Sequence, residues 1–224
     1  EINFCMYSLS DEKTTVKPLS KLDKVLSFDY SDDGKTLIFS GVSQGQTDLF
    51  YYRPLGNSIE QITNDFYDDM YPKFVHNSTA VIFASNRTND TLQRDVKVKP
   101  GNHNKDIFVY DLKTNNRVFK RITRTPDADE SWPSLLDTMN YTYLSDENGV
   151  VNRYRSFYDS AISFVDTTVH YRYFTKTTSL TNFNRNILEY DVNEKKGKYA
   201  FLMLKDGRYI FYTGKVTDDG KGLG

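Results

Sequence analysis

Two stretches of this chain repeat one pattern: a strand, a polar turn, a second strand, an acidic loop and a strand that contains proline. The pattern starts at Asp48 in one stretch and at Asp106 in the next, 58 positions later. Its proline recurs after 61 positions, at Pro72 and Pro133. A nearly constant offset with variable loops indicates supersecondary units that are stacked in series. The repeat therefore constrains the fold more than any single motif does.

The best-defined copy of the pattern covers residues 106–133. It predicts strands at Asp106–Asp111 and Arg117–Thr123, separated by a polar turn. The dipeptide Asp33-Gly34 between two apolar runs is a strong hairpin signal, because the turn needs a positive φ. The same reasoning predicts further strands at 2–7, 16–19, 27–30, 36–40, 48–52, 58–63, 70–75, 80–85, 132–135, 141–145, 151–158, 162–183, 187–191, 199–204 and 208–213. Residues 187–191 are assigned to the third strand of a fourth unit.

Four-strand units in series, without helical periodicity, predict an all-β chain folded as a β-propeller of four-stranded antiparallel blades. A β-sandwich is the alternative, but sandwiches do not repeat a whole unit at nearly fixed offsets. The chain opens inside a unit, so we expect an incomplete set of about four blades that belongs to a longer protein. We assign residues 1–216 to the propeller and the Gly-rich residues 217–224 to a flexible tail.

Composition narrows the function classes. The 224 residues include 17 Tyr and 15 Phe, which favour strands. The 29 basic and 30 acidic residues give a net charge of −1, which argues against a protein that binds nucleic acid by neutralising phosphates. No apolar run reaches the roughly 18 residues of a membrane-spanning helix. The single cysteine, Cys5, allows no internal disulfide.

Several segments resemble the TolB-type β-propeller repeat across residues 1–191. They are DDGKTLIFS, SNRTND, NKDIFVYDL, RITRTPDADESWP and LSDENG. The chain departs from the repeat at Leu135-Leu136-Asp137, which replaces a Ser-Pro-Asp-Gly turn, and at residues 159–178, which are inserted. The segment that begins at Ser145 is similar to large TolB-like envelope proteins of the Bacteroidota. The resemblance implies a periplasmic protein that contacts outer-membrane proteins or lipoproteins.

Acidic residues precede the innermost strand of two successive units. They are Asp65 and Asp68 in one unit and Asp127 and Asp129 in the next. In a propeller, the loop that enters the innermost strand and the loop between the second and third strands open on the same face. We therefore predict that these four carboxylates surround the mouth of the central channel and bind a partner or a cation, since oxygen-rich loops suit hard cations.

The basic residues of the same predicted face lie in a long insertion, residues 86–105. Arg87 and Arg94 are its candidate partner-binding residues. The alternative for the acidic loops is a structural role, in which carboxylates cap loop backbone and bridge blades. We assign that role to Asp69 and Glu130. Phe28, Tyr71 and Trp132 are predicted at equivalent positions of innermost strands, where they pack between blades.

No catalytic residue, metal site or cofactor is predicted. Residues 41–45 match the nucleophile elbow G-x-S-x-G, but the elbow requires a strand that leads into a helix. Here the motif falls in a predicted loop, residues 41–47, between two strands. His76, His103 and His170 lack the spacing of zinc ligands.

Two functions fit these observations. The first is a non-catalytic TolB-like propeller that docks other proteins in a bacterial envelope complex for outer-membrane assembly or transport. The second is the substrate-gating propeller of a serine peptidase of the prolyl-oligopeptidase or tricorn type, whose catalytic domain lies outside this segment. A sialidase-like glycosidase fits less well, because its Asp-box places Gly two positions after Asp, whereas Gly34 directly follows Asp33.

Overall fold

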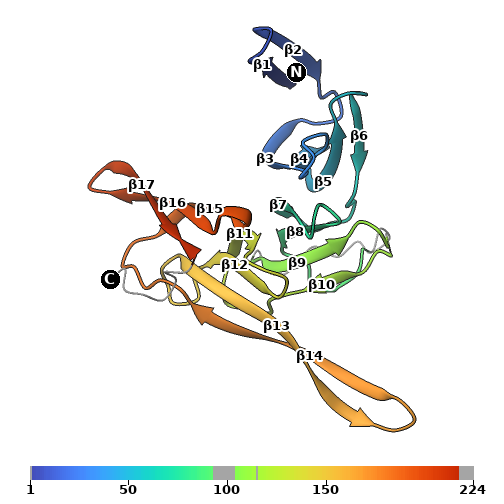
Figure 1. The fold of residues 1–224 in the computed structure, drawn as a ribbon, viewed down its shortest axis with the longest axis vertical. Helices are drawn as coiled ribbons and strands as arrows, with labels where there is room; N and C mark the ends of the chain where they lie inside the picture. The colour runs from blue at the N-terminus through green and yellow to red at the C-terminus, as the bar shows by residue number, and fades with distance from the viewer. Residues whose placement is uncertain (1, 93–103, 115, 217–224) are drawn as a thin grey trace.

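The computed structural model describes residues 2–92, 104–114 and 116–216. These residues form five separate antiparallel sheets that follow one another along the chain and in space (Figure 1). Three of the sheets have four strands, the first has two and the last has three. The all-β propeller prediction is confirmed, and the sheets do not close into a ring, as expected of an incomplete propeller.

Each sheet is built from consecutive strands. The first pairs β1 (Asn3–Ser8) with β2 (Lys13–Pro18), and blade 1 contains β3 (Lys24–Tyr30), β4 (Leu37–Ser43), β5 (Gln46–Arg53) and β6 (Ser58–Gln61). Blade 2 contains β7 (Asp69–Val75), β8 (Ala80–Ser85), β9 (Asp106–Asp111) and β10 (Phe119–Arg121). Blade 3 contains β11 (Glu130–Leu135), β12 (Asn140–Ser145), β13 (Asn152–Val165) and β14 (Val169–Ser179). The last sheet contains β15 (Ile187–Asn193), β16 (Lys198–Lys205) and β17 (Arg208–Lys215), with a 3-10 turn, η1 (Glu194–Lys196), between β15 and β16.

A bulge marks the innermost strand of each blade. The register slips after Val25 in β3, after Met70 in β7 and after Ser131 in β11. At this point Tyr71 and Trp132 have a positive φ, which is rare for residues with a Cβ. The centroids of their rings lie 4.7 Å apart, so the bulges direct these two side chains toward each other between neighbouring blades.

The bulges correct two predictions. In β3 the irregularity lies at Leu26, which lacks the positive φ of Tyr71 and Trp132, and Phe28 is largely exposed rather than packed between blades. In β15 the register slips between Ile187 and Glu189, and β15 is the first strand of its sheet. Residues 187–191 are therefore an innermost strand, not the third strand that the sequence suggested.

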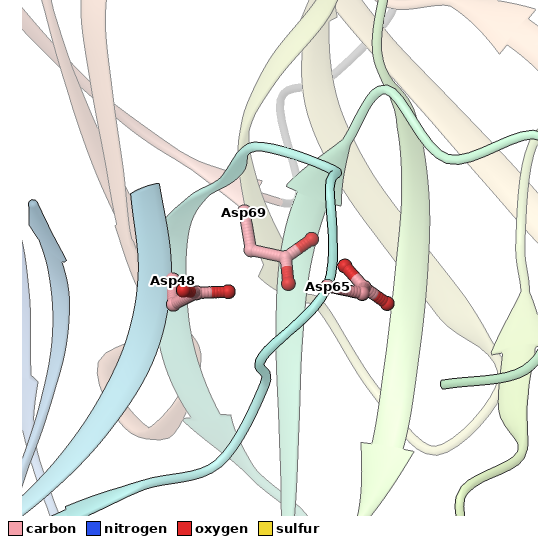
Figure 2. A group of neighbouring side chains, drawn as sticks. All are labelled: Asp48, Asp65 and Asp69. Atoms are coloured by element: carbon pink, nitrogen blue, oxygen red, sulfur yellow. The ribbon is translucent and has the colours of Figure 1, made fainter. Parts of the chain in front are cut away.

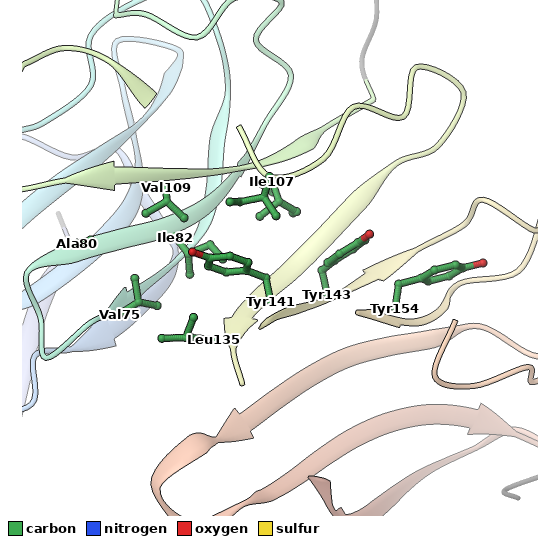
Figure 3. Close-up of a cluster of buried hydrophobic side chains, with 11 residues drawn as sticks. Val75, Ala80, Ile82, Ile107, Val109, Leu135, Tyr141, Tyr143 and Tyr154 are labelled. Carbon is green, nitrogen blue, oxygen red and sulfur yellow. The ribbon is translucent and has the colours of Figure 1, made fainter. Parts of the chain in front are cut away.

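Both faces of a central blade are buried. In β8, Ile82 and Ala84 point toward blade 3, whereas Val81 and Phe83 point toward blade 1. This alternation follows from the two-residue period of a strand. Figure 3 shows the first group, in which Ile82 packs with residues of β9, β11, β12 and β13, including Tyr141.

Two-residue turns with positive φ join several strands. Gln44 and Gly45 connect β4 to β5, and Asp206 and Gly207 connect β16 to β17. The predicted loop 41–47 is therefore mostly strand, and the G-x-S-x-G match is a hairpin. A positive φ at both central positions suits the right-handed twist of the flanking strands.

The hairpin formed by β13 and β14 extends far beyond the rest of blade 3, and Figure 1 shows it as a projecting arm. We call residues 159–175 the arm. The predicted strand 162–183 is wrong as a single element, because Asp166 and Thr168 form a turn inside it. The predicted insertion at residues 159–178 corresponds to this hairpin.

The alternation in β8 leads to a stability test. We expect Ile82→Ala to lower the free energy of unfolding by about 2–5 kcal/mol, because Ile82 is fully buried between two blades. Ile162→Ala is the matched control: Ile162 is 60% exposed on the arm, so its loss is expected to cost no more than about 0.5 kcal/mol. Urea denaturation measures both changes. Equal losses in the two variants would contradict the proposed packing.

Candidate functional site

The loops of one face of the propeller are joined by hydrogen bonds. The Gln46 side chain donates to the backbone oxygen of Tyr67 at 2.8 Å, so the turn after β4 contacts the loop before β7. The Asp68 amide donates to Asn86 at 2.8 Å, and the Asp129 amide donates to Asp146 at 2.7 Å. The loops that enter innermost strands thus lie beside the loops after second strands.

Five of the six predicted partner-binding residues are described by the structure, and they occupy different depths of this face. Asp127 is exposed, and Asp68 and Asp129 are partly exposed. Asp129 forms an ion pair with Lys105, with Nζ–Oδ1 at 2.9 Å. Asp65 and Arg87 are buried and bind each other, so their side chains do not reach the surface. Arg94 lies outside the described residues.

Arg87 is the centre of a buried ionic cluster. Its Nη2 atom donates to both oxygens of Asp69, at 2.8 and 2.9 Å, and Nη1 donates to Asp65 at 3.2 Å. Its Nε atom donates to the Ser85 hydroxyl at 3.0 Å. The Phe119 ring lies 4.1 Å from the guanidinium carbon, close enough for a cation–π contact. Sequence reasoning placed Arg87 on the surface because it follows a strand and begins a polar insertion.

Asp48 completes the cluster from blade 1. It is 1% exposed, and its Oδ2 atom accepts a hydrogen bond from Gln61 at 2.9 Å. Burial, and then the neighbouring Asp69 carboxylate, raise the pKa of Asp48 to about 8. One carboxylate oxygen from each of Asp48, Asp65 and Asp69 lies within 4.8 Å of the others, and Figure 2 shows the three side chains together.

A second buried polar cluster lies at the equivalent position one unit later, in blade 2. It contains a different set of charged residues. Asp106 corresponds to Asp48, and the Arg121 guanidinium donates directly to it. The amide of Thr125 donates to Asp106 at 2.9 Å, and Glu130 contacts the hydroxyls of Thr123 and Thr125. Glu130 is fully buried, and this burial raises its pKa to about 8.

In three blades, a threonine hydroxyl accepts a hydrogen bond from a backbone amide of the third strand. Thr63 accepts from the amide of Leu49 at 2.9 Å, and Thr123 accepts from the amide of Ile107 at 2.8 Å. Thr181 accepts from Arg153 at 2.9 Å, with Asn152 in the place of the aspartate. In the first two blades the aspartate and the threonine lie close enough in sequence for this pair to be recognised. In the third blade the residues of the arm lie between Asn152 and Thr181, so the pair could not be recognised from the sequence.

A cleft of about 800 Å³ lies between β10 and the base of the arm. Lys120 lies in it, with Nζ 3.5 Å from the centroid of the Tyr158 ring. Burial lowers the pKa of Lys120 to about 8. Tyr141, Tyr173 and Thr175 are among the other lining residues, and the Thr175 hydroxyl donates to the backbone oxygen of Ile122 at 2.6 Å. Arg121, Arg124, Asp90 and Asp111 also line the cleft, so it combines aromatic rings with several charged groups.

The two histidines that the structure describes, His76 and His170, lie in different parts of the fold. His76 is half-buried, and burial lowers its pKa. His170 lies on the arm and is within 3.1 Å of the Asp166 carboxylate. His103 lies outside the described residues. Among the residues that the structure describes, no helix is long and apolar enough to cross a membrane.

The fold is similar to that of solved TolB proteins. TolB from Acinetobacter baumannii matches 97% of this chain with a TM-score of 0.65 and 16% identity. A putative TolB from Agrobacterium tumefaciens matches 95% with a TM-score of 0.69 and 13% identity. The chain has a TolB-like β-propeller fold. It spans 47% of the Acinetobacter protein and 70% of the Agrobacterium protein.

Part of an enzyme has a similar fold. Puromycin hydrolase matches 91% of the chain with a TM-score of 0.59 and 10% identity, and the match spans 29% of that enzyme. No family model matches the chain, and no curated protein matches it. The narrower likeness to Bacteroidota envelope proteins stays a prediction.

The Arg87 cluster predicts a large effect of one substitution. Arg87→Met leaves Asp65 and Asp69 buried without their counter-charge, so we expect the free energy of unfolding to fall by about 3–5 kcal/mol. Arg124→Met is the control, because the side chain of Arg124 is 72% exposed and its pair with Asp90 is on the surface. Urea denaturation distinguishes the two. A loss below about 1 kcal/mol for Arg87→Met would show that the buried pair is dispensable.

Glu130 predicts a pH dependence. Its folded pKa of about 8 exceeds that of an unfolded glutamate, roughly 4.3, so between these values the folded protein binds the extra proton. Stability contributed by Glu130 is therefore greatest at low pH and falls as pH rises from about 4.3 to 8. Glu130→Gln keeps the hydrogen bonds without the titration. We expect a smaller decrease in Tm between pH 5 and pH 8 in the variant than in the wild type. An equal decrease would mean that Glu130 does not titrate in this range.

Proposed function

We propose that this chain is a non-catalytic docking propeller that holds other proteins of a bacterial envelope complex. One observation carries the proposal: the arm presents a continuous apolar face to solvent. Tyr173 is 64% exposed, Val165 is 64% exposed and Ile162 is 60% exposed. Large contiguous apolar surfaces on an otherwise polar protein are typical of interaction sites.

The pairing register places these side chains on one face. Ile162 pairs with Tyr171, and Val165 pairs with Val169, so each pair lies on the same side of the hairpin. Ile162 and Val165 are three positions apart and would face opposite sides of a regular strand. The bulge between Ile162 and Phe164 adds one residue, so Val165 lies on the same side as Ile162. We call this surface the apolar face.

The opposite side of the arm is mixed. Ala161 pairs with Arg172, and Phe164 pairs with His170, with the two rings stacked 4.1 Å apart. Asp159 and Phe174 form another pair on this side. The arm is thus amphipathic, although neither side of it packs on a core in the described residues.

The apolar face continues into the cleft beside blade 2. Tyr158 and Tyr173 stack with their ring centroids 5.7 Å apart, and both rings line the cleft. A partner that presents an extended apolar segment would cover the face and enter the cleft. We assign the partner to the outer-membrane proteins or lipoproteins of the envelope and the chain to the periplasm, by analogy with the TolB-like fold. Asp68, Asp127 and Asp129 are proposed as a second, charged contact.

Affinity purification from the native envelope tests this function. We expect the double variant Ile162→Ser/Tyr171→Ser to lose at least 90% of the partners that the wild type retains, because both apolar side chains are removed from one pair. Ala161→Ser/Arg172→Ser changes the adjacent pair on the opposite side and is expected to retain them. Identical partners in all three samples would rule out docking through the apolar face.

The similarity to puromycin hydrolase favours a second function, the gating propeller of a serine peptidase. In that case the protein cleaves peptides, and a covalent serine-hydrolase probe labels it. Labelling outside this segment, together with unchanged partner recovery in both arm variants, would favour the peptidase over the docking propeller.

A further inference from the structure

The buried cluster around Arg87 has an excess of negative charge. Asp48, Asp65 and Asp69 contribute three carboxylates, whereas Arg87 contributes one positive charge, so the formal sum is −2. All four side chains are at least 93% buried. Uncompensated charge in a protein interior is costly, so the excess calls for a cation or for protons. A divalent cation would balance it completely.

One oxygen of the cluster, Asp48 Oδ1, is buried and has no hydrogen-bond partner at normal distance among the described residues. The Thr63 hydroxyl lies near Asp48 and makes a weaker interaction with it than Gln61 does. Figure 2 shows the Asp48 side chain extending from blade 1 toward Asp69. Buried polar atoms almost always have a partner, so this oxygen is a candidate ligand atom for a cation.

The internal repeat allows the surroundings of Asp48 to be compared with those of its equivalent in blade 2. In blade 2 the equivalent aspartate, Asp106, receives the Arg121 guanidinium. In blade 1 the residue at that position is Gln61, whose neutral amide binds only Asp48 Oδ2. The first cluster therefore lacks an arginine on Asp48, since its own Arg87 binds Asp65 and Asp69, and it has the carboxylate of Asp65 where the second cluster has Thr125.

We propose that Asp48, Asp65 and Asp69 bind a hard divalent cation, with Ca²⁺ as the first candidate. Carboxylate oxygens are the ligands that Ca²⁺ prefers, at about 2.3–2.6 Å. Three ligand oxygens within 4.8 Å of one another fit around one such ion. Arg87 retains its bonds, because each carboxylate has about four lone-pair sites for ligands and donors.

The ion would join two blades. Asp48 lies on β5 of blade 1, Asp69 lies on β7 of blade 2, and Asp65 lies on the loop that connects the blades. Because the ligands come from both blades, the bound ion fixes the position of one relative to the other. This site is separate from the apolar face of the arm, so its test is independent of the docking function.

Isothermal titration of the chelator-treated protein with CaCl₂ tests the site. We expect one ion per chain, and Asp48→Asn is expected to weaken binding at least tenfold. Asp127→Asn/Asp129→Asn removes two carboxylates from the loop surface and is expected to leave affinity unchanged. Absence of binding to the wild type, or full binding by Asp48→Asn, would overturn the proposal.

A charge swap provides a second readout. Gln61→Arg copies the residue of blade 2 into blade 1 and supplies the positive charge within the chain. We expect Ca²⁺ to raise the Tm of the wild type but not that of Gln61→Arg, whose Tm in chelator should already match or exceed that of the calcium-loaded wild type. An equal Tm increase on Ca²⁺ addition in both proteins would place the ion elsewhere.

Discussion

Packing of one sheet against the next is the interaction on which this molecule depends. A four-stranded sheet such as blade 2 has two apolar faces, and each must be covered. Ile82 and Val81, adjacent in sequence, are both fully buried because they face different neighbours. The loops, the ionic clusters and the arm all take their positions from this side-by-side stacking.

The stacking also explains why charged residues lie in the interior. Loops of successive blades converge where the innermost strands begin, and polar groups there lose contact with water. Asp69 and Glu130 both open innermost strands and are both fully buried. Their partners differ, since Asp69 binds Arg87 while Glu130 contacts threonine hydroxyls. The same backbone position thus accommodates an ion pair in one blade and a carboxyl group that binds two hydroxyls in the next.

Sequence patterns predicted the sheets well, because strand periodicity and turn residues are local. Asp106–Asp111 has the predicted bounds, whereas the fourth strand predicted over Arg117–Thr123 shortens to Phe119–Arg121. Whether a charged side chain is buried or exposed could not be predicted from strand periodicity and turn residues. Whether Arg87 faces solvent or Asp69 depends on contacts between segments, which periodicity does not contain. The sequence identified Asp48 as the start of a repeat. Only the structure shows that one of its carboxylate oxygens is buried without a hydrogen-bond partner at normal distance.

The order of the strands has a kinetic consequence. Every sheet is made from neighbouring segments of the chain, so most pairings close short loops and are expected to form rapidly. The last sheet, however, also reaches back to the first blades, through Lys195 with Asp32 at 2.7 Å and through Asp191 with Lys73. These contacts join residues more than a hundred positions apart and carry a higher loop-closure entropy. Assembly would therefore proceed from hairpins to blades, with the contacts of the last sheet to blades 1 and 2 as its slowest step.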